Sequence, residues 1–339
     1  METILLLAHT EADGSLAKHA LEALSVAKSV KGTLLVGLIG ENVQAAANRL
    51  AGCGAERFLA VTGKEFVQAR YASDAAAAEA ICRAAKATVV MASATSRGNR
   101  VLAGVAHRLG GRADMHVTDI EAADAILVTR WYYRQRMEAV FQRAQRPWVI
   151  ALESGCAQPW KGDAGTAKVE VVAVTLSDTA KRTTVSGVKA PAADQQTIRP
   201  DAKVLFVAGA GWTKKQADGQ THVKDAEKLI LDFLRLTKAS LGSSKSLVDL
   251  SGEGQAVLPF MSHLNQVGQT GSTPRHPKGI STCCHGEEPH AVGWRFINER
   301  RAVNLDPNCG WARGKADVLY VADAFEVMKK VNALLAAKK

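Results

Sequence analysis

Two glycine-containing segments late in the chain carry residues suited to holding a phosphate-containing cofactor. The first is Gln266–Gly271, which reads Gln-Val-Gly-Gln-Thr-Gly, and Gly279-Ile280-Ser281 follows shortly after it. Glycine lets a backbone approach a ligand closely or take a positive φ, and backbone N–H groups in such turns bind anions. Gln and Thr side chains add hydrogen-bonding groups for a ring or a sugar. The segments predict either a nucleotide cradle built from two turns or a pair of ordinary surface turns.

Length and composition indicate a soluble globular protein of two domains. The chain has 339 residues, of which 47% are hydrophobic and 22% are charged, and a single hydrophobic core stops growing at roughly 250–300 residues. No stretch approaches the roughly 20 apolar residues of a membrane-spanning helix. The apolar run Ile4–Ala8 is too short for a signal peptide and predicts a buried first strand. We expect a cytoplasmic location of the bacterial type, or the mitochondrial matrix if a presequence has been removed.

The net charge of +10 raises the question of nucleic-acid binding. The densest basic run, Arg130–Arg136, interleaves arginines with aromatic residues. Such a run either binds single strands or forms one face of a half-exposed strand. Because no nucleic-acid recognition module accompanies the charge, we expect no nucleic-acid partner and favour a surface that docks an acidic protein.

The six cysteines show no CxxC pair. A chain of this size does not need disulfides to fold, so reduced thiols are expected. Cys309 is expected to serve packing.

The first half of the chain alternates strands and helices. The expected strands are Thr3–Ala8, Thr33–Ile39, Arg57–Val61 and Thr88–Ala92, and the expected helices are Gly14–Val30, Glu41–Ala51, Asp74–Ala87 with Ser73 as N-cap, and Asn99–Leu109. Further strands are expected at Ala125–Arg130, Met137–Gln142, Pro147–Leu152 and Lys168–Val174. The pattern predicts an α/β fold for residues 1–188: a parallel sheet with helices on both faces and added antiparallel strands.

The alternation restarts after a proline-containing linker at residues 189–200. The expected elements of the second domain, residues 201–339, are strands at Lys203–Ala208, Ser246–Leu250, Ala302–Leu305 and Val318–Val321 and helices at Val223–Ser240 and Asp323–Ala337. This order predicts a Rossmann-like fold. Gly209-Ala210-Gly211 follows the first of these strands, but position 214 is Lys, so the dinucleotide fingerprint is incomplete and an NAD site of that type is not expected.

The second half resembles the alpha (large) subunit of electron-transfer flavoproteins. Six motifs in chain order carry the resemblance across about 130 residues, with an interdomain Arg199-Pro200 before them: Gly242–Asp249, Gln266–Gly271, Gly279–Ser281, His290–Gly293, Asn304–Asp306, and Ala316-Asp317 with Val321–Phe325. Gln266–Gly271 is identical to the family's signature. The first half matches mainly in its alternation of strands and helices.

The resemblance implies an FAD-binding electron carrier rather than an enzyme that transforms a substrate. In this family the C-terminal domain holds FAD against a smaller beta subunit that binds AMP, and electrons pass from a flavoprotein dehydrogenase to a quinone reductase or other acceptor. Membrane contact would then be peripheral and only through the acceptor. Two alternatives stay open: a bifurcating relative whose beta subunit holds a second FAD, and a nucleotide-binding or structural subunit without redox activity.

The resemblance also assigns roles to individual residues. Thr270 would hydrogen-bond the flavin edge near N5, and His290 would lie at the O2 side, where it stabilises charge on the reduced ring. Asn304 and Asp317 would lie near the adenosine end. The expected cofactor-binding residues are Ser244, Lys245, Gln266, Val267, Gly268, Gln269, Thr270, Gly271, Gly279, Ile280, Ser281, His290, Asn304 and Asp317.

Three positions depart from the family pattern. Lys245 stands where the family has Arg, which keeps the charge but loses the planar fork. Trp212 follows Gly209-Ala210-Gly211 in place of the family's arginine motif and is expected either to cover the adenine or to pack. An insertion between Thr282 and Pro289 carries Cys283-Cys284-His285, for which a plain loop is favoured over a metal site or a redox relay. No metal is expected.

Two histidines flank the signature segment. His263 precedes it and His276 follows it. Both are expected to be surface or turn residues rather than cofactor contacts.

Overall fold

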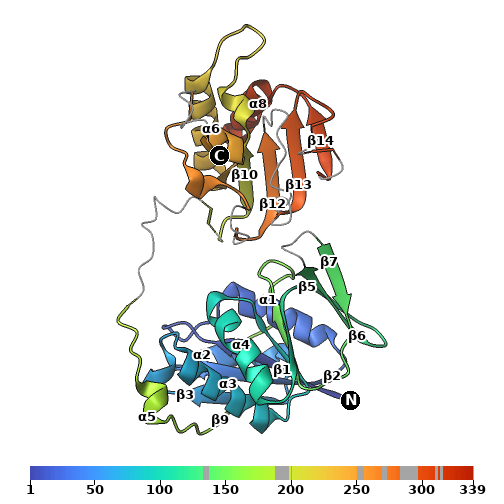
Figure 1. Cartoon of the computed structure of the whole chain (residues 1–339), viewed down its shortest axis with the longest axis vertical. Helices are drawn as coiled ribbons and strands as arrows, with labels where there is room; N and C mark the ends of the chain where they lie inside the picture. Colours follow the sequence, from blue (N-terminus) through green and yellow to red (C-terminus); the bar gives the residue numbers. More distant parts are fainter. Residues whose placement is uncertain are drawn as a thin grey trace. The chain divides into compact units, whose positions relative to one another are not determined.

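The computed structural model divides the chain into two compact units, Met1–Lys189 and Ala190–Lys339 (Figure 1). The structure describes residues 1–132, 137–187, 198–199, 201–249, 256–268, 273–282, 297–309, 312–313 and 316–338. Most of the predicted linker 189–200 therefore lies outside the described residues.

Within the described residues, the first unit is built on a nine-stranded sheet of order β7-β6-β5-β8-β4-β1-β2-β3-β9. The strands are β1 (Glu2–His9), β2 (Gly32–Gly40), β3 (Arg57–Thr62), β4 (Val89–Ser93), β5 (Arg112–Ala122), β6 (Ile126–Tyr132), β7 (Met137–Phe141), β8 (Trp148–Leu152) and β9 (Val169–Val171). All neighbours pair in parallel except β5 with β6 and β6 with β7. The predicted α/β fold with added antiparallel strands is confirmed.

Helices cover both faces of the first sheet. The central strand β1 is apolar from Ile4 to Ala8, so both of its faces must be buried. Leu5 and Leu7 pack among residues of α3 and α4, whereas Leu6 and Ala8 pack among residues of α1 and α2, as successive side chains of a strand point to opposite faces. The helices are α1 (Lys18–Ser29), α2 (Gln44–Arg49), α3 (Tyr71–Ala85), α4 (Ser96–Arg108) and α5 (Asp178–Lys181), with short 3-10 turns at Ala51–Cys53 and Lys64–Phe66.

Two local expectations for the first unit were wrong. Arg70, not Ser73, precedes the first residue of α3, and the Ser73 hydroxyl accepts a hydrogen bond from Arg70 Nε inside the first turn. The strand β5 was not expected, although the alternation of polar and apolar residues along it is typical of a partly exposed strand.

The second unit contains a five-stranded parallel sheet, within the described residues, of order β11-β10-β12-β13-β14. Its strands are β10 (Val204–Ala208), β11 (Ser240–Ser243), β12 (His276–Thr282), β13 (Ile297–Asn304) and β14 (Val318–Val321), and its helices are α6 (Val223–Thr237), α7 (Lys245–Asp249) and α8 (Ala324–Ala337), with 3-10 turns at Ala210–Thr213 and His263–Asn265. The predicted strand Ser246–Leu250 was wrong, because Ser244 caps a helix there. No helix among the described residues is both long and apolar enough to cross a membrane.

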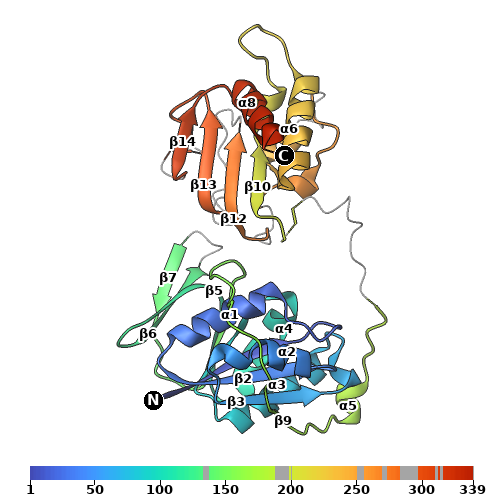
Figure 2. The ribbon, with the colours of Figure 1, turned by 180° about the vertical axis from the view of Figure 1, so that it is seen from behind.

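One face of the second sheet is covered by α6 and α8, which lie side by side in both views (Figure 2). Phe206 and Ala208 of β10 point into this layer. The Trp212 ring packs 4.6 Å from the Phe325 ring, measured between centroids. The opposite face carries a smaller cluster that includes Leu205, Val207 and Val267.

A buried carboxylate ties the antiparallel strands to the parallel part of the first sheet. Asp114 of β5 has a side chain with 0% exposure. It accepts hydrogen bonds from Trp148 Nε1 at 2.9 Å, Arg143 Nη2 at 2.8 Å and Arg130 Nη1 at 3.2 Å. Burial alone would raise the pKa of Asp114, but the hydrogen bonds from Arg143 and Trp148 outweigh it, so the pKa is lowered.

We predict that Asp114→Asn destabilises the first unit by about 3 kcal/mol, because two partly buried guanidinium groups lose their counter-charge. The surface pair Arg57–Glu170 provides a control, since its side chains are 38% and 43% exposed. Glu170→Gln should leave the unfolding midpoint nearly unchanged, because exposed ion pairs contribute little to stability. Urea unfolding of both variants checks the difference, and equal losses would contradict a special role for Asp114.

Candidate functional site

The expected cofactor residues gather mainly at the carboxyl edge of the second sheet. The parallel register places Ala208 of β10 beside Ser243 of β11 and Thr282 of β12. After β10 the chain adds β11 on one side and then β12 on the other. Ligands of open parallel sheets bind where the strand order reverses in this way.

The end of β11 supplies polar side chains at this edge. Ser243 is fully buried, and its hydroxyl has no hydrogen-bond partner among the described residues. The Ser244 hydroxyl accepts a hydrogen bond from the backbone N–H of Leu247 at 3.2 Å and so begins α7. Lys245, the first residue of α7, is exposed. A buried hydroxyl without a hydrogen-bond partner lowers the stability of the folded state. A polar ligand atom that pairs with the Ser243 hydroxyl would therefore stabilise the fold.

The start of the signature segment lies directly against β11. Val267 N donates to Ser243 O at 3.1 Å, and Gln266 bridges to Ser243 in the parallel sense. Gly268 has a φ of 80°, which explains a glycine at this position, and its N–H donates to Thr273 Oγ1 at 2.8 Å. Gln269, Thr270, Gly271 and His290 lie outside the described residues.

The second glycine-containing segment is not a turn. Gly279-Ile280-Ser281 forms part of β12, so the expected turn was wrong. A Cβ on Gly279 would lie 2.6 Å from Ile297 Cδ1, so the absence of a side chain here makes room for the neighbouring strand. Ser281 is 2% exposed and lies one residue before the carboxyl end of the strand.

The two residues expected near an adenosine are not brought together. Asn304 ends β13 at the carboxyl edge and is buried. Asp317 precedes β14, and its Oδ2 accepts a hydrogen bond from Arg300 N at 2.6 Å. Because Arg300 is four positions before Asn304, at about 3.3 Å per residue Asp317 lies roughly 13 Å along the sheet from the carboxyl edge.

Trp212 stands where the family has its arginine motif, and it is a core residue. Its side chain has no exposure, and its Nε1 donates to Thr282 Oγ1 at 2.9 Å. Of the two expectations for Trp212, the structure shows packing. Thr282 and Ser243 were not expected at the site, although each directly adjoins an expected residue.

His276 is buried, so its expected surface position was wrong. Its Nδ1 lies 2.7 Å from Pro274 O, and its Nε2 lies 3.0 Å from Arg199 O and 3.1 Å from Ser240 Oγ. Burial lowers the pKa of His276 and outweighs the hydrogen bonds to the two carbonyls. A neutral imidazole has one N–H, so it can donate to only one of the two carbonyls, Pro274 O or Arg199 O.

The thiols differ from the expectation at one position. Cys309 is disulfide-bonded, so the expectation that all thiols are reduced was wrong. Cys53, Cys82 and Cys156 are not in disulfides. Burial raises the pKa of Cys82 to about 12, which makes it an unreactive packing residue.

The chain belongs to the electron transfer flavoprotein domain family, whose model matches residues 4–179. It is also 25% identical over 319 residues to an electron transfer flavoprotein subunit alpha from Syntrophomonas wolfei subsp. wolfei. That match covers 93% of this chain and 94% of the relative. The chain is therefore a divergent member of the alpha-subunit family, and the resemblance seen in its motifs is confirmed.

We predict that Gly242→Ala loosens the signature segment from β11. An added Cβ would lie 2.4 Å from Val267 Cγ2, and overpacking of this kind costs about 1–3 kcal/mol. Hydrogen exchange at the Val267 amide should accelerate. Gly187→Ala is the control, because a Cβ there meets nothing within 4 Å. An unchanged Val267 amide in Gly242→Ala would show that this contact does not hold the segment.

We also predict that His276 makes the second unit less stable in mild acid. Its folded pKa is lowered from 6.5, so the unfolded chain binds the proton first, and stability falls as the pH drops below about 6.5. Exchange of β12 amides between pH 7.5 and 5.5 measures this loss. His276→Gln should remove up to about 1.4 kcal/mol per pH unit of it, whereas the exposed His263→Gln should not. Equal pH dependence in both variants would exclude His276 as the cause.

Proposed function

We propose that the chain is the FAD-binding large subunit of a heterodimeric electron-transfer flavoprotein. Its partner would be a beta subunit that holds AMP, and its electrons would pass from a flavoprotein dehydrogenase to a quinone reductase or other acceptor. The observation that carries this proposal is the attachment of Gln266–Gly268 to the end of β11, beside the Ser243 hydroxyl, which has no hydrogen-bond partner in the described part of the chain. The alpha-subunit name of the Syntrophomonas wolfei relative supports it.

The described residues of the carboxyl edge fit a flavin dinucleotide. Ser243 offers a buried hydroxyl, and Gly268 brings its backbone through a left-handed turn without a side chain. Ser244 starts α7 next to them, and Lys245 adds a positive charge. By contrast, Trp212 and Gly279 are used for packing, so the cradle would be formed by the loops after β11 and around Gly268 rather than by the body of β12.

Bound FAD would supply the redox chemistry by accepting electrons and passing them on. The chain would bind and orient the ring. Lys245 would favour negative charge on it, and the same effect is assigned to His290 by the resemblance. Thr270 would donate at the flavin edge. Because FAD would carry the electrons and the chain would hold and tune it, the protein would act as an electron carrier.

Two further candidates differ in cofactor content. In a bifurcating relative the partner subunit would hold a second FAD in place of AMP. A nucleotide-binding or structural subunit without redox function is favoured by one observation, the use of Trp212 as a core residue where the family has an arginine motif. A cytoplasmic or matrix location, peripheral membrane contact only through the acceptor, and the absence of a nucleic-acid partner are part of the same proposal.

Cofactor analysis of the chain purified with its beta-type partner tests the function. We expect a yellow complex with one FAD and one AMP per heterodimer. Two FAD per heterodimer would instead indicate the bifurcating form. A colourless complex that takes up no added FAD would overturn both. Gly187→Ala, which changes an open position in the other unit, is the matched control and should keep the full FAD content.

A further inference from the structure

The disulfide-bonded Cys309 lies in the connection that follows β13. The strand ends at Asn304, and the chain then turns, with Cys309 N donating to Asp306 O at 3.2 Å and Ala312 N donating to Cys309 O at 3.0 Å. Cys309 is 1% exposed. The turn therefore places a buried, covalently bonded sulfur next to the carboxyl end of β13.

The partner of Cys309 follows by elimination. The chain has six cysteines. The cysteines of the first unit are all described, and none of them is in a disulfide: Cys53, Cys82 and Cys156. The two cysteines that remain, Cys283 and Cys284, are adjacent in the sequence and lie outside the described residues. One of these two is therefore bonded to Cys309.

The register of the second sheet agrees with this pairing. Thr282, the last residue of β12, lies beside Val303 of β13. In the sequence, the two candidate partners come directly after Thr282, and Cys309 comes shortly after Val303. Consecutive Cα atoms are 3.8 Å apart, and a disulfide joins Cα atoms that are roughly 4.4–6.8 Å apart. The bond thus joins two connections that leave neighbouring strands at the same edge of the sheet.

Cys309 also supports the signature segment from below. It belongs to one buried cluster with Val207 of β10 and Val267 of the signature segment, on the sheet face opposite α6 and α8. Val267 is 2% exposed, and its N–H holds the segment to β11 through Ser243 O at 3.1 Å. Because close-packed interiors transmit strain, a change that loosens Cys309 weakens the support of Val267.

The fold does not need this disulfide for its stability. Each of the two units has its own large buried core, whereas disulfides are required mainly by small secreted domains that lack one. In the cytoplasm, the location proposed above, disulfides are rare, and those that form are usually transient and serve catalysis or redox sensing. A bond that supports a candidate cofactor segment fits redox sensing.

We propose that the Cys309 disulfide is a reducible tether that controls how firmly the signature segment is attached to β11. Its effect on flavin binding rests on the proposed function, whereas the bond and its effect on the segment do not. The reductant is a dithiol. Its thiolate attacks one sulfur of the disulfide, the S–S bond breaks, and the other sulfur leaves as a thiolate. The second thiol of the reductant then attacks the mixed disulfide, so that the protein gains two electrons and two protons and the dithiol becomes a disulfide.

Peptide mapping of the full-length chain, alkylated without reduction, tests the bond itself. Trypsin cuts after lysine and arginine, so it places Cys309 in peptide 302–313 and its two candidate partners in peptide 279–295. We expect these two peptides to be linked and dithiothreitol to separate them. An alkylated Cys309, or a link between Cys309 and a cysteine of the first unit, would overturn the proposal.

Hydrogen exchange at the Val267 amide tests the effect of the bond. Dithiothreitol should accelerate this exchange about tenfold or more in the parent, and Cys309→Ala should exchange at the faster rate with or without the reductant. Cys156→Ala is the matched control, because it removes a cysteine that is not in a disulfide. It should keep both the slow rate and the response to dithiothreitol. The reductant changes no side chain, so the parent alone decides the result if Cys309→Ala does not fold. An equal rate in the oxidised and reduced parent would contradict the tether.

Flavin retention separates this inference from the proposed function. Neither the mapping nor the exchange measurement requires bound FAD, so both can succeed in a chain that binds none. In the complex with the beta-type partner, the parent that has been reduced and alkylated should lose FAD during gel filtration sooner than the oxidised parent. Oxidised Cys156→Ala should retain FAD as the oxidised parent does. Equal retention in the two states of the parent would show that the bond does not control the flavin segment and would overturn that part of the proposal.

Discussion

Parallel strand pairing is the constraint on which both units depend. A parallel neighbour can be added only after the chain has crossed back to the same end of the sheet, so helices fill the faces and loops collect at the carboxyl edge. Where the strand order reverses, two loops leave in opposite directions and a crevice opens between them. This occurs beside β1 in the first sheet and beside β10 in the second. The same geometric rule thus applies once in each sheet, and in the first unit a crevice lies at that position.

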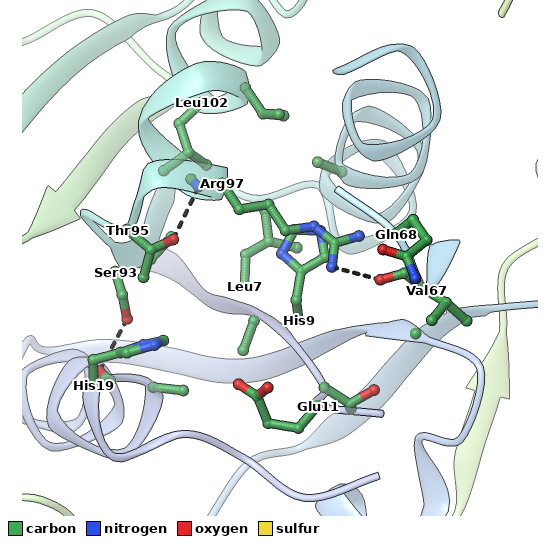
Figure 3. Close-up of a pocket in the computed structure, with 18 of the residues that line it drawn as sticks. Leu7, His9, Glu11, His19, Val67, Gln68, Ser93, Thr95, Arg97 and Leu102 are labelled. Atoms are coloured by element: carbon green, nitrogen blue, oxygen red, sulfur yellow. Dashed lines mark hydrogen bonds between the residues drawn. The ribbon is translucent and has the colours of Figure 1, made fainter. Parts of the chain in front are cut away.

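The two edges differ in how their polar groups are arranged. In the second unit, the end of β11 holds the beginning of the signature segment, and glycines at 242 and 268 allow that close contact. In the first unit, two helix starts and two imidazole rings surround a space whose one side is fixed by the Arg97–Asp74 ion pair. The first arrangement suits a long cofactor laid along loops, whereas the second is lined by both acidic and basic side chains (Figure 3).

The sequence predicted the fold better than the contacts of individual side chains. Runs such as Ile4–Ala8 are apolar throughout and identify buried parallel strands, and the signature Gln266–Gly271 identified the family. The helix α7 was mistaken for a strand because its apolar pattern is short, and its start depends on the Ser244 cap. The burial of His276 depends on Arg199 and Ser240, and that of Trp212 on Thr282 and Phe325. Local periodicity contains no information about partners 36 to 113 positions away.

The Ser243 hydroxyl is buried and has no hydrogen-bond partner within the described ranges, which has a consequence for the lifetime of the protein. A group that is buried without a partner lowers the stability of the empty chain, whereas any molecule that pairs it binds the native state alone and shifts the folding equilibrium toward that state. The population of opened molecules available to proteases would then depend on the supply of that molecule. Cells short of the cofactor would therefore clear the second unit faster, and the abundance of the protein would follow its ligand without any dedicated regulator.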